Sequence, residues 1–219
     1  MNKNLEQKKK YINWNEVIIS KEIIELILCE NIFLGSTDTV LGLFAPLGVQ
    51  GLEALNKLKG RSQKPYIVLV SDINQAALFS SQISDDEQVK ELAHSVWPGP
   101  VTLIVRARAN VQSFMLSKDG TIALRVPDHA AIRALLSKVP GLFSTSANKH
   151  GEAFPRKVSQ VNQHVIDGVN YVVFDEEEHE TPITPSTLID CTRYPFHIIR
   201  EGILSPKVQQ LLQRFGSMR

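Results

Sequence analysis

The spacing of apolar and polar residues changes along the chain, so that segments with helical spacing and segments with strand-like spacing follow one another. Apolar residues recur with helical spacing over 51–58, which predicts an amphipathic helix that ends at Lys59-Gly60. The next apolar run, 66–70, is continuous and rich in β-branched residues, which is typical of a strand buried on both faces. Segments of both kinds follow one another to the end of the chain. They predict an α/β fold in which helices cover a sheet.

The same pattern predicts the remaining elements. Further helices are expected at 85–96, 130–136 and 206–215, and an earlier amphipathic helix is expected to begin at a Ser20 cap. Strands are expected at 32–34, 66–70, 101–105, 121–126, 141–143, 171–174, 186–190 and 197–200. No internal repeat and no long linker interrupts the series. We therefore expect one domain, residues 13–219, preceded by a flexible basic arm at residues 1–12.

Composition excludes several classes of protein. The formal net charge of +1 over 219 residues gives no global attraction to nucleic acid or membranes, although the basic arm could contact RNA. Two cysteines without a CxxC pair, Cys29 and Cys191, support neither a disulfide framework nor a zinc ribbon, and we expect both thiols to be buried. The start of the chain is polar, unlike a signal peptide, and no apolar run approaches the ~20 residues of a membrane span. A cytoplasmic location is expected.

Candidate chemistry gathers in three short segments, 35–39, 59–61 and 144–148, each placed where an apolar run or a helical pattern ends. Together they offer small hydroxyl side chains, backbone N–H groups and two cations, Lys59 and Arg61. Such a set suits a triphosphate, because Lys and Arg form charge-assisted hydrogen bonds to phosphate oxygens. Each segment alone has an ordinary structural explanation. The cations complement the dipole at a helix end, and the serines and threonines form a polar turn.

Seven motifs follow one another in a recognisable order. They are Thr37-Asp38-Thr39-Val40, Lys59-Gly60-Arg61, Trp97-Pro98-Gly99-Pro100, Ala123-Leu124-Arg125-Val126-Pro127, Ser144-Thr145-Ser146-Ala147-Asn148, Pro185-Ser186-Thr187 and Arg200-Glu201-Gly202. In this order, over about residues 15 to 204, the sequence resembles the YrdC-like family in its short bacterial form. Two departures are that Ser36 stands where proline is usual, and that the spacing from Arg61 to Lys64 is one residue shorter than usual.

The resemblance implies a single-domain, twisted mixed α/β sheet flanked by helices around a basic cavity. It also implies a reaction, in which L-threonine, bicarbonate and ATP give threonylcarbamoyl-AMP and pyrophosphate. This is the first step of the threonylcarbamoyladenosine modification of tRNA at position 37. The implied partners are the proteins that use the product, TsaD, TsaB and TsaE, with weak contact to tRNA itself.

The resemblance also assigns roles to individual residues. The implied catalytic residues are Lys59, Arg61, Ser146 and Asn148. The implied ATP-binding residues are Lys59, Arg61, Lys64, Ala147, Asn148 and Arg200. The implied threonine-binding residues are Thr39, Arg125, Thr145 and Ser186. The planar fork of Arg125 suits a carboxylate, and the hydroxyl side chains can distinguish threonine from valine.

No protein-bound metal is expected, because the six histidines lack ligand spacing such as HExxH. Any Mg²⁺ is expected to arrive on the ATP phosphates. The acidic run at 175–180 fits a solvated loop, with magnesium binding as its alternative.

Other functions also fit the resemblance. One is a noncatalytic protein for double-stranded RNA binding or ribosome maturation that uses the same basic cavity. The near-zero net charge and the lack of interleaved aromatic residues disfavour it. A carbamoyltransferase step in hydrogenase maturation is disfavoured by the short length and the few cysteines. A diverged paralogue is disfavoured because Lys59, Arg61, Ser146 and Asn148 are all present.

Overall fold

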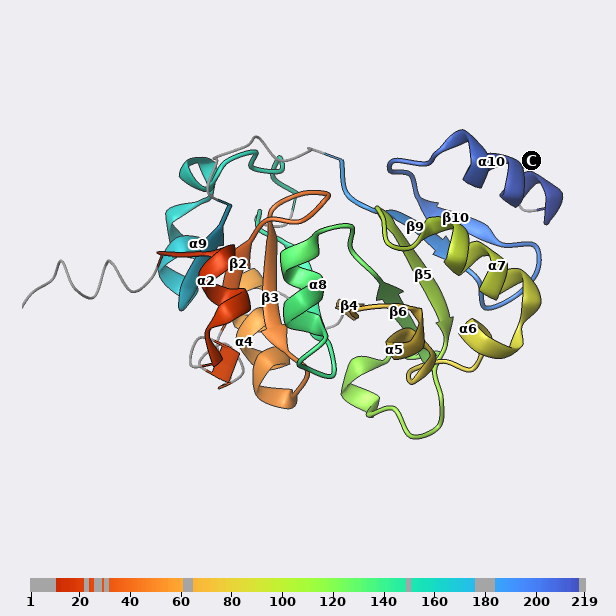
Figure 1. Ribbon diagram of the computed structural model, residues 1–219, viewed down its shortest axis with the longest axis horizontal. Coiled ribbons are helices and arrows are strands. Elements are labelled where there is room, and N and C mark those ends of the chain that lie inside the picture. The colour runs from red at the N-terminus through yellow and green to blue at the C-terminus, as the bar shows by residue number, and fades with distance from the viewer. Residues whose placement is uncertain are drawn as a thin grey trace, which may run out of the picture.

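The computed structural model describes residues 11–21, 24–25, 29, 32–60, 65–148, 151–175 and 184–216 (Figure 1). The strands are β1 (Tyr11–Asn13), β2 (Phe33–Gly35), β3 (Gly42–Pro46), β4 (Ile67–Leu69), β5 (Val101–Arg106), β6 (Thr121–Arg125), β7 (Leu142–Ser146), β8 (Tyr171–Phe174), β9 (Thr187–Asp190) and β10 (His197–Arg200). The α-helices are α2 (Trp14–Ile19), α4 (Val49–Lys59), α5 (Ile73–Ala77), α6 (Gln82–Asp85), α7 (Glu87–Val96), α8 (Ala130–Leu136), α9 (Gln163–Gly168) and α10 (Pro206–Arg214). The described residues also include two 3₁₀ turns, η1 (Ser113–Met115) and η2 (Val158–Gln160).

All ten strands belong to one twisted sheet, in the order β1-β8-β2-β3-β7-β4-β6-β5-β9-β10. Four neighbouring pairs, β1–β8, β8–β2, β4–β6 and β5–β9, are parallel. The other five are antiparallel. The predicted mixed α/β sheet with flanking helices is therefore confirmed.

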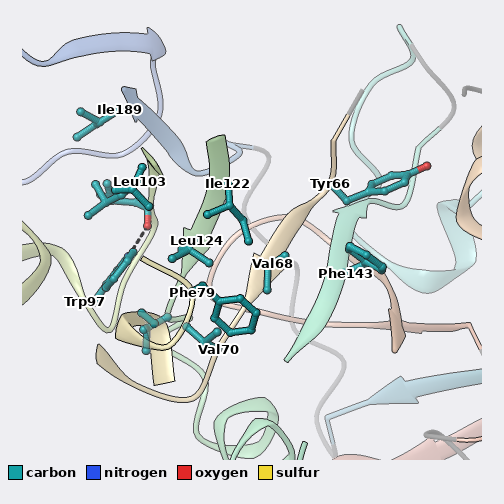
Figure 2. Packing of buried hydrophobic residues seen from close by; sticks show 14 of the residues in the cluster. Tyr66, Val68, Val70, Phe79, Trp97, Leu103, Ile122, Leu124, Phe143 and Ile189 are labelled. Carbon is teal, nitrogen blue, oxygen red and sulfur yellow. Dashed lines mark hydrogen bonds between the residues drawn. The ribbon is translucent and has the colours of Figure 1, made fainter. Parts of the chain in front are cut away.

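The sheet separates two apolar clusters. On β3, Leu43 belongs to the larger cluster and the next residue, Phe44, to the smaller one, because successive side chains point to opposite faces. The helices α4, α7 and α10 pack on the larger cluster, which Figure 2 shows around Val68, Leu103 and Phe143. The helices α2 and α8 contact each other and pack on the smaller cluster, as Figure 1 shows. Each fully buried Leu or Phe contributes roughly 1.5–3 kcal/mol to the stability of this arrangement.

Capping residues set the helix boundaries. The α4 helix ends as predicted, because Gly60 adopts the left-handed conformation (φ 60°). The predicted helix at 85–96 is wrong at its start, because Asp86 has extended backbone angles and separates α6 from α7. The Asp86 Oδ1 accepts hydrogen bonds from the N–H groups of Gln88 and Val89, both at 3.2 Å, which begins a new helix at Glu87.

Four other sequence-based predictions need comment. The predicted turn at 144–148 is wrong in its first part, since residues 144–146 continue β7 and pair with β3. Cys191 is buried as expected, but Cys29 is exposed in a turn, so that prediction is wrong. The helix predicted to start at Ser20 lies largely outside the described residues, as do residues 1–10 of the predicted arm. Tyr11 and Ile12, also assigned to that arm, pair with β8.

No helix among the described residues is long and apolar enough to span a membrane.

Candidate functional site

The loop between β2 and β3 is held in shape by two threonines. The Thr37 hydroxyl lies 3.1 Å from the Thr39 hydroxyl and accepts a hydrogen bond from the Thr39 N–H at 3.2 Å. Both side chains are buried, and such hydroxyl-to-backbone contacts stabilise a tight turn. The loop therefore presents Asp38 and Thr39 in fixed positions beside the end of β6.

Arg125, at the end of β6, has three hydrogen-bond acceptors. Its Nε donates to the Gly99 carbonyl at 3.1 Å and its Nη1 to Thr39 Oγ1 at 2.8 Å, while Nη2 forms an ion pair with Asp38 Oδ1. The residue is only 5% exposed. Burial lowers the pKa of Arg125 and the Asp38 carboxylate opposes that effect, but an arginine stays protonated in any case. The motif at 97–100 thus supplies an acceptor for this cation.

Arg200, on β10, is held over Ser186. Its Nε and Nη2 donate to the Ser186 carbonyl at 3.1 and 2.9 Å, and Nη2 also donates to Ser186 Oγ at 3.0 Å. The Ser186 hydroxyl lies 2.8 Å from Thr102 Oγ1. Burial lowers the pKa of Arg200, and the positive charge of Arg125 lowers it further. No carboxylate pairs with Arg200 within the described part of the chain. Its positive charge is therefore not neutralised by an ion pair there, and it adds to that of Arg125.

A second group forms around Lys59, the last residue of α4, rather than just beyond the helix as the sequence suggested. Its Nζ donates to the carbonyls of Ser146, at 2.8 Å, and Asn148. The Ser146 hydroxyl donates to Asn148 Oδ1 at 2.6 Å, and Asn148 Nδ2 donates to the Glu152 carbonyl at 2.6 Å. The buried ammonium group thus fixes the backbone of the segment that follows β7.

The loop between β2 and β3 joins the two groups. Thr39 accepts the hydrogen bond from Arg125, and two residues later the Leu41 carbonyl accepts one from the Ala147 N–H at 2.8 Å. The sheet register also places the two groups on one face of the sheet. Leu69 on β4 pairs with Arg125 on β6 and with Leu142 on β7, so the side chains of Arg125 and Leu142 lie on the same face.

Strand alternation separates one predicted residue from the others. Ser146 lies four positions after Leu142 on β7 and therefore shares its face with Arg125. Thr145 is one position away and pairs with Leu43, so its side chain points to the opposite face. The structure therefore does not bring the Thr145 side chain into this group.

The sequence-predicted residues divide into three sets. Residues linked through the β2–β3 loop are Thr39, Arg125, Lys59, Ser146, Ala147 and Asn148, and Ser186 and Arg200 form a pair beside them. Thr145 points to the opposite face of β7. Arg61 and Lys64 lie outside the described residues. Sequence reasoning missed the direct contacts that Asp38 and Thr102 make with site residues. Asp38 stands between the two threonines of a motif, and Thr102 lies two residues after the motif at 97–100. This position in or beside a motif is the sequence feature that could have identified both residues.

Among the described residues, no three His, Cys, Asp or Glu side chains are grouped so that they could hold a metal ion. The donor set is instead cationic and hydroxyl-rich, which suits anionic ligands.

Fold and site thus define an α/β protein with a cluster of cations and hydroxyl groups beside the β2–β3 loop. The model of the Sua5/YciO/YrdC family, described as telomere recombination, matches residues 25–202, and the chain belongs to this family. A relative named threonylcarbamoyl-AMP synthase from Idiomarina loihiensis is 34% identical over 142 residues, 63% of this chain and 75% of the relative. A relative of the same name from Pyrococcus abyssi is 29% identical, over 84% of this chain and 53% of the relative.

Solved structures agree with this family. The structure of P. abyssi Sua5 complexed with L-threonine is 26% identical, with a TM-score of 0.76 over 92% of this chain and 60% of that one. Escherichia coli YciO, at 20% identity and a TM-score of 0.75, covers 90% of this chain and 97% of its own and shares the fold.

Proposed function

We propose that this protein is a threonylcarbamoyl-AMP synthase, which converts L-threonine, bicarbonate and ATP into threonylcarbamoyl-AMP and pyrophosphate. Relatives from several bacteria carry this name, and a related Sua5 structure holds L-threonine. This reaction would be the first step of threonylcarbamoyladenosine formation in tRNA.

The observation that carries the proposal is that two buried cations, Arg125 and Lys59, and several hydroxyl groups are linked through one loop. Arg125 donates to Thr39, and Lys59 holds the segment whose Ala147 N–H donates to Leu41. Arg200, an exposed cation held at Ser186, adds positive charge near Arg125. The reaction brings a carboxylate, a bicarbonate and a triphosphate together. Fixed cations and hydroxyl donors would stabilise negative charge as it moves from the carbamate to the leaving pyrophosphate.

Two subsites follow from this arrangement. Arg125 would bind the threonine carboxylate, with the hydroxyl groups of Thr39 and Ser186 nearby, whereas Thr145 is left out because its side chain points to the opposite face of β7. Lys59 would keep the segment at 146–148 in shape, so that Ser146, Ala147 and Asn148 face the ATP phosphates. Arg200, Arg61 and Lys64 would supply further positive charge. Because no described residue is placed as an activated nucleophile, positioning and electrostatics would carry the rate.

The finer parts of the proposal concern cofactors and partners. Mg²⁺ would enter on the ATP phosphates as part of the substrate, without a protein-bound metal. The product would pass to TsaD, TsaB and TsaE, with at most weak contact between this chain and tRNA, and the reaction would take place in the cytoplasm.

A pyrophosphate-release assay tests the activity. Release is expected only when ATP, Mg²⁺, bicarbonate and L-threonine are all present, because the carbamate is the group that displaces pyrophosphate. Omission of each component in turn is the control. Equal release without threonine would indicate a plain ATPase and would contradict the proposal.

A further inference from the structure

Asp38 places a carboxylate among the cations of the site. Its Oδ1 pairs with Arg125, but its Oδ2 is buried and has no hydrogen-bond partner within the described part of the chain. A buried charged oxygen without a donor is costly to leave in that state. The contact with Arg125 uses only one of the two oxygens that share the negative charge, so the missing hydrogen-bond donor at the second oxygen calls for a separate explanation.

The charges of the proposed substrates supply that explanation. A triphosphate, a bicarbonate and a carboxylate are all anions, and each would be repelled by Asp38. The α-ammonium group of an amino acid is the cation among the reacting groups. We propose that Asp38 is the amine-binding residue of the site, with Oδ2 accepting an N–H of L-threonine while Arg125 binds its carboxylate. This inference rests on the proposed function.

The Arg125–Asp38 pair offers the two charges that an amino acid requires: a guanidinium group for its carboxylate and a carboxylate for its ammonium group. A guanidinium group has five N–H bonds, and three of those of Arg125 have partners in the described part of the chain, which leaves two for a substrate carboxylate. The two charged groups of an amino acid sit on one carbon, and this ion pair presents opposite charges side by side. The Asp38 side chain is 12% exposed, so the residue as a whole is not closed off from the surface.

The contact would also orient the amine for reaction. The ammonium group first loses one proton to solvent. The neutral amine then attacks the carbon of bicarbonate, so that an N–C bond forms, a C–O bond breaks and water leaves with a second proton from the nitrogen. An N–H held by Asp38 directs the lone pair toward that carbon. The carbamate nitrogen keeps one N–H, so the same contact persists after that step. Asp38 would thus position the nitrogen without itself taking part in bond formation.

The wild-type protein provides the first test, which needs no variant. (R)-3-hydroxybutanoate keeps the carboxylate and the hydroxyl group of L-threonine but lacks the amine. Calorimetry is expected to show that it binds about tenfold or more weakly than L-threonine, because it leaves Oδ2 unpaired. Equal affinity of the two ligands would overturn the inference.

Asp38→Asn provides the second test. Asparagine can still accept the hydrogen bond from Arg125, but it replaces the charged Oδ2 with an N–H donor. Affinity for L-threonine is expected to fall about tenfold or more, whereas that for (R)-3-hydroxybutanoate stays within about twofold. Equal losses for both ligands would show that Asp38 only supports Arg125 and would overturn the inference, as would an unchanged affinity for threonine.

A matched control is Asp72→Asn, which also removes a carboxylate near an arginine, Arg133, but lies outside the site. It should leave both affinities unchanged. Failure of the proposed function looks different, since the wild-type protein would then neither bind L-threonine nor release pyrophosphate. If the wild type makes the product but does not distinguish the two ligands, only the role of Asp38 is wrong.

Discussion

Single side chains at this site are fixed by several bonds each, and Arg125 is the clearest case. Its three acceptors come from two segments that are distant in the sequence: the β2–β3 loop supplies two of them and the Gly99 carbonyl the third. A lysine would keep the charge but is a point donor, so it cannot reproduce the planar fork. Geometry as well as charge therefore matters at this position.

Arg125→Lys is expected to weaken L-threonine binding by about 1–3 kcal/mol, the range for a lost charge-assisted hydrogen bond, while ATP binding alone changes little. Calorimetry with each ligand measures both effects. Arg133→Lys, on α8, is the matched control, because its Nε also donates to a backbone carbonyl, that of Ser71. An RNA-binding module would respond to charge and salt rather than to shape, so unchanged threonine affinity in Arg125→Lys would remove this residue from the site.

Lys59→Ala is expected to lower the rate of synthesis by roughly 10²-fold or more, as the loss of a preorganised electrostatic contact typically does. The buried ammonium group also holds the carbonyls of Ser146 and Asn148, so the phosphate-facing segment would lose its anchor. Lys57→Ala is the control, because Lys57 is an exposed cation two residues earlier on α4. Near-normal turnover of Lys59→Ala with an intact fold would contradict the assignment.

At the scale of elements, polar side chains at strand and helix ends hold the site loop in place. Ser36 follows β2; its hydroxyl accepts from Trp14 Nε1 at 3.0 Å and donates to Asp175 Oδ2, after β8, at 2.6 Å. Asp175 Oδ1 lies 3.4 Å from His129 Nε2, and His129 caps α8 through its Nδ1. The serine that departs from the usual family pattern thus ties the β2–β3 loop to α2 and β8.

Asp72 caps α5 and gives the fold a pH-dependent contribution. The Gln75 N–H, followed by the Ser71 hydroxyl, holds the pKa of Asp72 below its usual range, although burial opposes this. The ionised carboxylate therefore stabilises the folded state above the usual pKa of an aspartate, and this contribution is lost as pH falls through the lower, folded-state value. Asp72→Ala should reduce the free energy of unfolding by about 1 kcal/mol at neutral pH.

Urea unfolding of the wild type and Asp72→Ala, at neutral pH and in acid, measures this difference. The gap between the two proteins should narrow in acid, because the wild type then loses the charged cap as well. Asp72→Asn, which keeps a capping oxygen, should lose less stability at neutral pH than the alanine variant. A gap that stays constant with pH would contradict the argument.

Elements with strong periodicity could be predicted from the sequence, and those set by distant contacts could not. The α8 helix and the strands β8 and β10 have the predicted bounds, because their apolar spacing is clear. The β3 strand and the strand character of residues 144–146 were missed, since their pairing with each other across about a hundred residues decides both. The sequence motifs identified the segments that form the site. They could not show that Asp38 pairs with Arg125, because that contact joins residues far apart in the sequence and depends on how the sheet folds.

At the scale of the whole molecule, one sheet couples two apolar clusters that lie on its opposite faces. The two tryptophans of the chain divide between them, with Trp14 in the smaller cluster and Trp97 in the larger one. Each indole also has a hydrogen bond, to Ser36 Oγ and to the Val101 carbonyl. The β2–β3 loop contacts both clusters, because Ser36 accepts a hydrogen bond from Trp14 of the smaller cluster and Leu41 belongs to the larger one. The geometry of the loop therefore depends on both clusters remaining folded together.

This coupling predicts one cooperative unfolding transition. Trp97→Phe leaves Trp14 as the fluorescent reporter of the smaller cluster, and Trp14→Phe leaves Trp97 to report on the larger one. Adding Phe44→Ala, which opens a cavity in the smaller cluster only, should lower stability by about 3–5 kcal/mol in both backgrounds. Because the sheet carries both clusters, the Trp97 signal should shift as far as the Trp14 signal in urea titrations. A shift confined to the Trp14 reporter would show that the two faces unfold independently.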